Sequence, residues 1–196
     1  MEPLPFDPQI AGVDEAGRGP IAGPLVVAAA ILPEGFDATG LNDSKKLTAG
    51  QRDFVFWRIV AQCRYSLVIV PPQEVDRLNI LRATLLAMGR SIAELDPPAA
   101  VVDGNQPPVG ASCPTSTLIK GDAKNASIAA ASILAKVTRD RLMAEAASAF
   151  PGYGFDTHFG YYNPAHREAL ARLGPCAIHR RSFEPVKSML NQPGLF

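Results

Sequence analysis

The segment Gly12–Pro20 constrains this chain more than any other part of the sequence. It places two adjacent carboxylates, Asp14 and Glu15, at the end of a short apolar stretch, and an arginine with a glycine on each side, Arg18, follows at once. Because successive side chains of a strand point to opposite faces, the two acids can serve one site only where the strand ends or bulges. The glycines supply that irregularity. A divalent cation is the simplest reason for two negative charges beside such an accessible backbone.

The composition is that of an ordinary globular protein, and 196 residues suffice for one domain with a real core. The N-terminus has no basic or apolar region typical of a secretory signal, and the longest apolar run, Leu25–Leu32, is too short to span a bilayer. We therefore expect a cytoplasmic protein without a membrane segment. Cys63, Cys113 and Cys176 are scattered and odd in number, which indicates reduced thiols rather than a disulfide framework or a zinc site.

The net charge of zero argues against a generic polyanion binder. The charges are unevenly distributed, however, since residues 1–119 carry 9 basic and 13 acidic side chains and residues 120–196 carry 10 and 6. An acidic N-terminal part and a basic C-terminal part fit a carboxylate-lined metal centre that faces a phosphate-binding flank. Random fluctuation explains the charge distribution equally well.

Strand and helix signals follow one another in an order typical of a mixed α/β sheet flanked by helices. We expect strands over residues 9–17, 22–32, 64–70, 99–103 and 115–120. Helices are predicted over residues 48–62, 79–95, 125–150, 164–173 and 182–190, the first of them starting with a capping box. We expect residues 1–150 to form a core built around the sheet and residues 151–196 to form a helical C-terminal segment, within one compact unit.

Two further carboxylates stand where chemistry is expected. Asp103 follows a short apolar strand, at the position where α/β sheets bind ligands; the alternative is a turn aspartate before glycine. Asp140 falls on the same predicted helix face as Ile133 and Val137, where an unpaired charge is expensive. A metal ion, or Lys136 one turn earlier, would offset that charge; the alternative is an exposed position where the apolar stripe ends.

Four carboxylates from separate segments, without a His or Cys cluster, favour hard cations such as Mg²⁺ or Mn²⁺ over zinc. Such sites hold two ions that activate a water molecule for phosphoryl displacement. His158, His166 and His179 lack the spacing of a zinc protease, so we expect hydrogen-bonded or surface histidines. The glycine pattern after Glu15 superficially matches a dinucleotide fingerprint, but it precedes a strand rather than the helix that the fingerprint requires.

Several basic and aromatic residues could contact a nucleic acid. The candidate phosphate contacts lie in loops or beside helix starts, where a solvated turn is the alternative for any one of them. Tyr161 offers an aromatic face to a base or sugar, with a core tyrosine as the alternative. Ser182 is expected to cap the next helix so that the preceding arginines reach phosphates. The candidate phosphate contacts are Lys45, Lys46, Lys120, Arg180 and Arg181.

Taken in order, these motifs resemble bacterial ribonuclease HII, a type 2 ribonuclease H. The resemblance covers nearly everything from about Ala11 to Val186. It is carried by Gly12–Pro20, Leu41–Leu47, Val102–Asn105, Lys120–Asp122, Ala130–Asp140 and His179–Phe183.

The resemblance implies an RNase H-like fold and metal-dependent cleavage of RNA strands paired with DNA, including incision at single ribonucleotides embedded in duplex DNA. It implies cleavage on the 5′ side of the ribonucleotide, which leaves a 3′-hydroxyl and a 5′-phosphate, with two Mn²⁺ or Mg²⁺ ions. Residue by residue, the metal-binding carboxylates of the family match Asp14, Glu15, Asp103 and Asp140.

Two further matches concern the substrate sugar. The segment Gly17-Arg18-Gly19 matches the loop whose backbone reads the ribose 2′-hydroxyl, the group that distinguishes RNA from DNA. Tyr161 matches the tyrosine that packs against the sugar at the RNA–DNA junction. The chain departs from the family at Phe159, where a lysine is usual, so a phosphate contact beside the tyrosine is missing.

Two other functions compete with this interpretation. A metal-dependent DNA nuclease or phosphatase would keep the metal centre but take another substrate. A non-catalytic hybrid-binding module would not need four self-repelling carboxylates. The tail Gln192–Phe196 resembles short peptides that dock on bacterial sliding clamps, and an end with an incidental apolar pair is the alternative. We expect a monomer.

Overall fold

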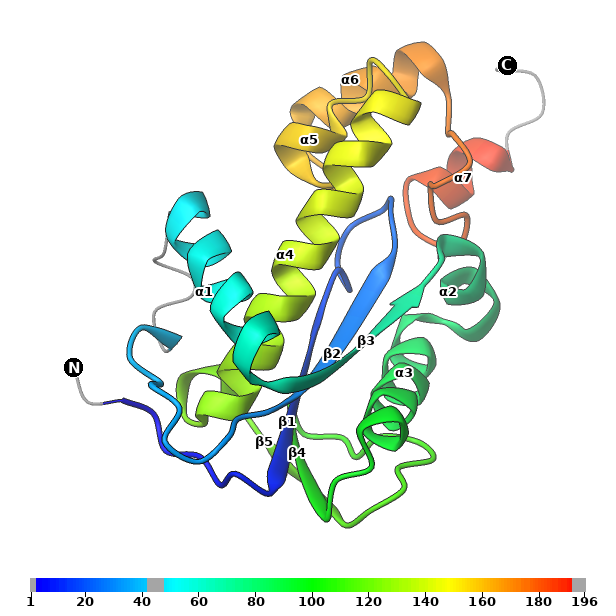
Figure 1. Ribbon diagram of the computed structural model, residues 1–196. Helices are drawn as coiled ribbons and strands as arrows, with labels where there is room; N and C mark the ends of the chain where they lie inside the picture. The colour runs from blue at the N-terminus through cyan, green and yellow to red at the C-terminus, as the bar shows by residue number, and fades with distance from the viewer. Residues whose placement is uncertain (1–2, 42–47, 192–196) are drawn as a thin grey trace.

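The computed structural model describes residues 3–41 and 48–191, which form a five-stranded mixed sheet with helices on both faces (Figure 1). The strand order is β3-β2-β1-β4-β5. Pairing is antiparallel between β1 and β2 and between β2 and β3, and it is parallel between β1 and β4 and between β4 and β5. The strands are β1 (Ile10–Ala16), β2 (Leu25–Ile31), β3 (Arg64–Val70), β4 (Ala99–Asp103) and β5 (Thr115–Leu118).

The helices begin where the sequence provides caps. Thr48 and Gln51 form the predicted capping box of α1, and the side chains of Asn79 and Asn125 cap α3 and α4. These local signals explain why the observed bounds agree closely with the predicted ones. The helical elements are α1 (Ala49–Gln62), α2 (Pro72–Leu78), α3 (Ile80–Leu95), the 3₁₀ turn η2 (Gly121–Ala123), α4 (Ala126–Ala149), α5 (Phe155–His158), α6 (Pro164–Leu173) and α7 (Val186–Leu190).

Two hydrophobic cores lie on the two faces of the sheet, and β2 contributes to both. Val26, Ala28 and Ala30 pack in the core with α1 and α4, whereas Val27 and Ala29 pack in the core with α3. Figure 1 shows the same arrangement, with α1 and α4 on one side of the sheet and α2 and α3 on the other. Strand β2 is therefore apolar on both faces, as its sequence indicates.

Helix α4 lies unusually close to β1. A methyl group added at Gly12 would stand 2.1 Å from the carbonyl carbon of Ser127, so only glycine permits this approach. The contact sets the start of α4 against the middle of β1. It thereby places the carboxyl end of β1 beside the polar side chains of the same helix.

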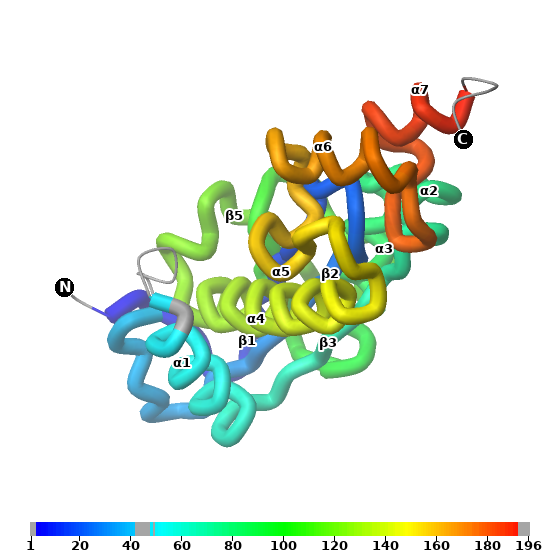
Figure 2. Tube along the Cα trace, turned by 90° about the horizontal axis from the view of Figure 1, so that it is seen from above, coloured from blue at the N-terminus to red at the C-terminus, as the bar shows by residue number. Residues whose placement is uncertain are grey.

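The C-terminal helices α5 and α6 pack over the end of α4 rather than on the sheet, and α7 lies farther away, near α2 (Figure 2). A third hydrophobic core, with Met143, Phe155 and Leu170 among its members, joins them to α4. A β-bridge between Ala22 and His179 ties this part of the chain to the loop after β1. None of the described helices combines the length and apolar character needed to cross a membrane.

Three elements differ from the sequence prediction. The sequence prediction does not include helices α2 and α5. Pro72 follows the end of β3 and begins α2, because the first turn of a helix needs no amide donor. The helix predicted over residues 182–190 begins only at Val186. Ser182 does not cap it, because the hydroxyl and amide of Ser182 both donate to the carboxylate of Asp76, at 2.6 and 2.9 Å.

The three histidines are buried and hydrogen-bonded, as expected, and two of them form a directional chain. The amide of Cys176 donates to His179 Nδ1 at 2.9 Å, so the proton of that ring is on Nε2. His179 Nε2 then donates to His166 Nε2 at 3.0 Å, and His166 Nδ1 donates to the carbonyl of Tyr161 at 3.0 Å. His179 Nδ1 and His166 Nε2 both act as acceptors, so the chain as a whole requires both rings to be neutral. Burial lowers the pKa of both, that of His179 to about 4.

The hydrogen bonds through His179 and His166 predict that the protein loses stability in mild acid. An unfolded histidine takes up a proton near its ordinary pKa of 6.5, whereas folded His179 does so only near 4. Stability contributed by neutral His179 is thus present above pH 6.5 and is lost as the pH falls towards 4, by at most about 3 kcal/mol. Urea unfolding at pH 7 and pH 4.5 measures this difference. His179→Gln should lower stability at pH 7 but flatten the pH dependence, and equal slopes in both proteins would contradict the assignment.

Candidate active site

Parallel pairing of β1 with β4 brings three carboxylates to the same edge of the sheet. Val13 pairs with Val102, so Asp14 and Glu15, which lie within β1 close to its end, stand at the level where Asp103 ends β4. The carboxyl ends of parallel strands are the usual position of ligand sites in α/β proteins. The sequence prediction for these three residues therefore agrees with their placement.

Asp14 is the most buried of the three, with 6% of its surface exposed. Its Oδ1 accepts the amide of Glu15 at 2.7 Å, and the hydroxyl of Ser132 on α4 donates to the same carboxylate. Burial and, to a smaller extent, the negative charges of Glu15 and Asp103 raise the pKa of Asp14 to about 8. Burial also raises the pKa of Glu15, although Arg18 opposes this effect from 3.3 Å.

Asp103 connects the acidic pair to the segment before α4. Its Oδ1 accepts the amide of Gly121 at 2.7 Å, which fixes η2 against the end of β4. Asp122, the next residue, is half-buried and lies one residue from this contact. The sequence prediction of the site does not include Asp122. Its position could have indicated a site, because it is an acidic residue between a predicted strand and the long helix.

Asp140 is not brought to this group. Its Oδ1 accepts a hydrogen bond from Lys136 Nζ at 2.7 Å, which was the alternative partner expected from the sequence. Ser132, which contacts Asp14, precedes Asp140 by two helical turns, or about 12 Å along the axis of α4. Helical spacing places Asp140 on the expected side of α4 but at the wrong height for a shared cation.

The remaining donors suit a hard divalent cation chemically. They are carboxylate oxygens without a His or Cys among them, and a cation would offset both their burial and their mutual repulsion. In the described part of the chain no three His, Cys, Asp or Glu side chains converge closely enough to hold a metal ion. Glu15 pairs with Arg18 instead, and Asp103 accepts the amide of Gly121.

A cleft of about 460 Å³ opens beside these acids, between the loop of residues 17–19, α4 and Tyr161. Glu15 lies at its edge. The Tyr161 ring is half exposed, and a methyl group added at Gly19 would stand 3.5 Å from it. The cleft is large enough for one unit of a polymer. Its walls are a backbone loop on one side and a flat aromatic ring on the other.

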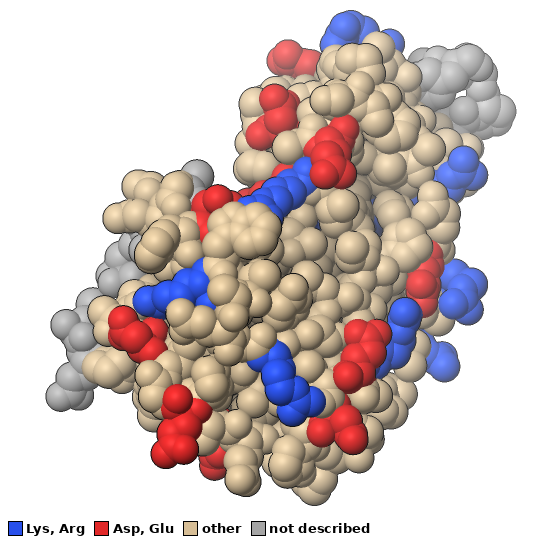
Figure 3. All heavy atoms as spheres, in the orientation of Figure 1, with Lys and Arg blue, Asp and Glu red and all other residues tan. Residues whose placement is uncertain are grey.

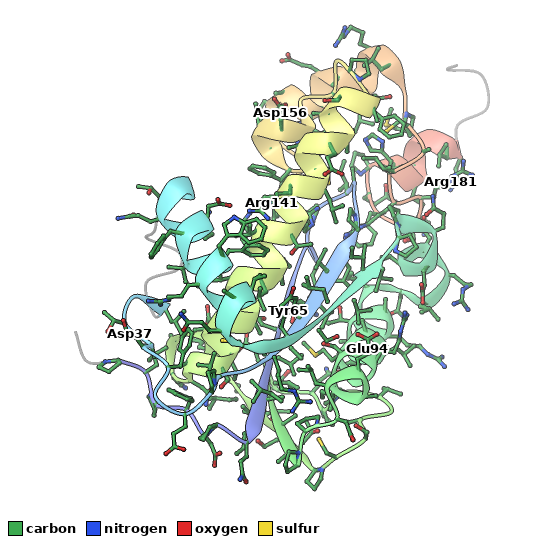
Figure 4. All side chains as sticks on the ribbon, in the orientation of Figure 1. Asp37, Tyr65, Glu94, Arg141, Asp156 and Arg181 are labelled. Atoms are coloured by element: carbon green, nitrogen blue, oxygen red, sulfur yellow. The ribbon has the colours of Figure 1, made fainter. Side chains whose placement is uncertain are left out.

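The two arginines predicted as phosphate contacts behave differently. Arg180 is completely buried, and its guanidinium donates only to backbone carbonyls of the loop after β1, so it cannot reach a phosphate. The β-bridge of its neighbour His179 draws it into the protein. Arg181 is exposed and lies on the side of α2 and α7 (Figure 4).

The predicted lysine contacts are only partly placed. Lys120 is exposed and precedes η2 in a left-handed backbone conformation. Lys45 and Lys46 lie outside the described residues. On the face that Figure 3 shows, basic and acidic side chains are interspersed rather than gathered into one patch. The expected basic flank is therefore not visible on that face.

Comparisons with known proteins give one consistent match. The sequence model of the family described as Ribonuclease HII matches residues 11–186. A Ribonuclease HII from Parvibaculum lavamentivorans is 53% identical over 188 residues, which cover 95% of this chain and 70% of that protein. One from Maricaulis maris is 53% identical over 184 residues, which cover 93% and 84%.

Solved structures agree with the sequence comparisons. Ribonuclease H2 from Pyrococcus horikoshii OT3 superposes with a TM-score of 0.80 at 30% identity, covering 92% of this chain and 96% of that one. The PCNA:RNase HII complex from Archaeoglobus fulgidus gives 0.79 at 29% identity, with 90% and 95% covered. Bst-RNase HIII in complex with Mn²⁺ gives 0.77 at 22% identity, with 92% and 68% covered, and shares the fold. These matches confirm the predicted α/β fold.

The raised pKa of Asp14 predicts that removing its charge stabilises the protein. Between pH 4 and pH 8 the folded state keeps a proton on Asp14 that the unfolded state has lost, so stability falls as the pH rises through this range. Asp14→Asn should therefore raise stability at pH 9 by a few kcal/mol, on the order expected for a shift this large. Thermal unfolding with a chelator, at pH 4 and pH 9, measures the effect. A variant that is less stable than wild type at pH 9 would contradict it.

Proposed function

Because the chain belongs to the ribonuclease HII family, we propose that it hydrolyses the RNA strand of RNA–DNA hybrids and incises duplex DNA at single embedded ribonucleotides. The observation that carries this proposal is a group of three carboxylates, of which Glu15 lines a cleft walled by glycine-loop backbone and a tyrosine ring. The acids suit phosphodiester chemistry, and the cleft suits recognition of a sugar. Such substrates place the activity in the cytoplasm.

We assign the cation site to Asp14, Glu15 and Asp103 and add Asp122, whose backbone lies beside Asp103. Asp140 is left out because of its distance along α4 and its pairing with Lys136. Mg²⁺ or Mn²⁺ fits this set of oxygen donors. Two such ions, when bound, supply an activated water and stabilise the leaving oxygen of an in-line displacement.

The surrounding residues prepare these carboxylates. Ser132 and the amide of Glu15 hold Asp14 in one orientation, so its second oxygen keeps a fixed direction. Asp14 carries a proton at pH 7, because its pKa lies at about 8. Loss of that proton exposes a full carboxylate, so cation binding strengthens as the pH rises.

The loop of residues 17–19 supports sugar recognition. Gly17 has a φ of +96°, and a methyl group added there would stand 2.1 Å from Arg139 Nε. Only glycine fits this position, and a loop without bulky side chains lets amides approach the ribose 2′-hydroxyl. The Tyr161 ring, facing Gly19, provides the surface on which the sugar packs.

Phosphate contacts come from the cations near the cleft. Arg18 lines it, and Lys136 lines it with Nζ lying 4.9 Å from the ring centroid of Phe159. Lys136, which is paired with Asp140, thus places an ammonium group next to position 159, where the family usually has a lysine. Lys120 and Arg181 are exposed and stay candidate contacts.

A cleavage assay tests the proposal. A duplex with one ribonucleotide should be cut in the presence of Mg²⁺ or Mn²⁺, and cutting should stop when a chelator is added. The all-DNA duplex of the same sequence should stay intact, which separates this function from a DNA nuclease. Asp103→Asn should nearly abolish cleavage, which separates it from a binding module. Equal cutting of both duplexes would refute the proposal.

Matched variants distinguish Asp122 from Asp140. Asp122→Asn should lower kcat by roughly 100-fold or more, the range expected when a group that stabilises transition-state charge is removed. Asp140→Asn should change kcat by only a few fold, because its carboxylate pairs with Lys136. Single-turnover rates at saturating Mn²⁺, with thermal unfolding as a check of folding, measure both. The reverse order of effects would restore Asp140 to the site.

We also propose that the tail Gln192–Phe196, which lies outside the described residues, docks on a bacterial sliding clamp. Support comes from its glutamine and terminal Leu-Phe pair. The structural relative from Archaeoglobus fulgidus is itself in a complex with PCNA. Deleting the five residues should abolish binding in a pull-down with purified clamp while leaving cleavage of free duplex unchanged. Undiminished clamp binding would eliminate this role for the tail.

A further inference from the structure

Arg180 is a fully buried guanidinium that binds the loop after β1 from beneath. Its Nη1 donates to the carbonyl of Arg18 at 3.0 Å, and its Nη2 donates to the carbonyl of Gly17 at 2.6 Å. Nε and Nη2 both donate to the carbonyl of Gly23, at 3.1 and 3.0 Å. The side chain thus joins both ends of the loop, although it stands more than 150 residues away in the chain.

This arrangement is unusual in its electrostatics. Among the described residues no carboxylate lies within ion-pair distance of Arg180. Backbone carbonyls accept all of its hydrogen bonds, its Cζ lies 5.0 Å from the ring centroid of Phe183, and Asp76 contributes a more distant negative charge. Burial and, to a smaller extent, neighbouring Arg139 lower the pKa of the guanidinium to about 9. Burying a cation without a directly paired counter-ion is costly for stability. The loop conformation that Arg180 holds therefore has a functional role to be sought, since stability alone does not explain the buried charge.

That geometry concerns two peptide units of the loop. In a trans peptide the carbonyl and the amide point in opposite directions. The carbonyls of Gly17 and Arg18 point inward to Arg180, so the amides of Arg18 and Gly19 point to the other side of the loop. Residues 17–19 line the cleft on that side. The hydrogen bonds among the described residues use neither amide.

A second buried arginine has a different task. Arg139, on α4, donates to the carbonyls of Ala22, Pro24 and Phe159. It therefore holds the far end of the loop and the segment before Tyr161, but it does not bind the peptide units that face the cleft. Of the two buried guanidiniums only Arg180 fixes the direction of the amides at Arg18 and Gly19.

We propose that Arg180 is a positioning residue for sugar recognition: it turns two adjacent amides into the cleft, where they bind the ribose hydroxyl of the substrate. The inference rests on the proposed function, because it assigns the origin of the sugar preference. Arg180 does not contact the substrate. Its contribution is to keep the two donors aligned before the substrate arrives.

Arg180→Lys tests this role, since lysine keeps the charge but cannot bridge three carbonyls with a planar fork. Affinities for the one-ribonucleotide duplex and the all-DNA duplex are compared in an Asp103→Asn background, which prevents cleavage. The preference for the ribonucleotide should fall roughly five- to tenfold, the loss expected for about one hydrogen bond. Affinity for the all-DNA duplex should stay within about twofold, since phosphate contacts are unaffected.

Arg172→Lys is the matched control. Arg172 also donates its guanidinium to a backbone carbonyl, that of Gly152, but at the surface of α6 and outside the cleft. The Arg172→Lys variant should prefer the ribonucleotide as strongly as the wild type does. Each variant is measured well below its own melting temperature, so that a difference in folding does not enter the ratio.

A wild-type measurement keeps the inference testable if Arg180→Lys does not fold. Amide NMR signals of Arg18 and Gly19 should shift with the one-ribonucleotide duplex and not with the all-DNA duplex. Equal shifts with both duplexes, or an unchanged preference in Arg180→Lys, would overturn the inference while leaving the proposed function intact. Absence of any ribonucleotide preference in the wild type would overturn both.

Discussion

The burial of Asp14 is the constraint on which the site depends. The carboxylate lies between β1 and α4, and two more acids, Glu15 and Asp103, stand close enough to raise its pKa further. Such a cluster opposes folding, so the neighbouring structure must hold it in place. The close approach at Gly12 and the hydrogen bond from Ser132 do this from the side of α4. Cation binding offsets this unfavourable free energy, because it relieves both the burial of the carboxylates and their mutual repulsion.

The buried cations of the protein do not neutralise these acids. Arg139 and Arg180 lie near the same loop, yet the carbonyls of that loop occupy their donors. Arg18 pairs with Glu15, and it does so from a half-exposed position. An arginine fork aimed at Asp14 would compete with any divalent ion. Because the guanidiniums of Arg139 and Arg180 donate to carbonyls, they hold the loop in shape without neutralising the carboxylates of the site.

Local signals predicted most of the fold, and long-range contacts account for what was missed. Asn79 and Asn125 mark helix starts in the sequence itself, and an acid after an apolar strand pointed to Asp103. Helical periodicity indicates which side of α4 a residue occupies but not which turn lies level with β1, so Asp140 was placed in the site. Asp122 escaped notice because its position depends on the parallel register of the polar strand β5.

The C-terminal segment belongs to the recognition surface and is more than a helical addition to the sheet. It contributes Tyr161 to the cleft and Arg180 to the underside of the loop. The chain from His179 to His166 ends on the carbonyl of Tyr161, and His179 immediately precedes Arg180. A displacement of His179 would therefore move both the aromatic wall and the residue that orients the amides. The loop of residues 17–19 and Tyr161 lie about 140 positions apart in sequence. Arg180 and the two neutral rings of His179 and His166 thus connect the geometry of one to that of the other.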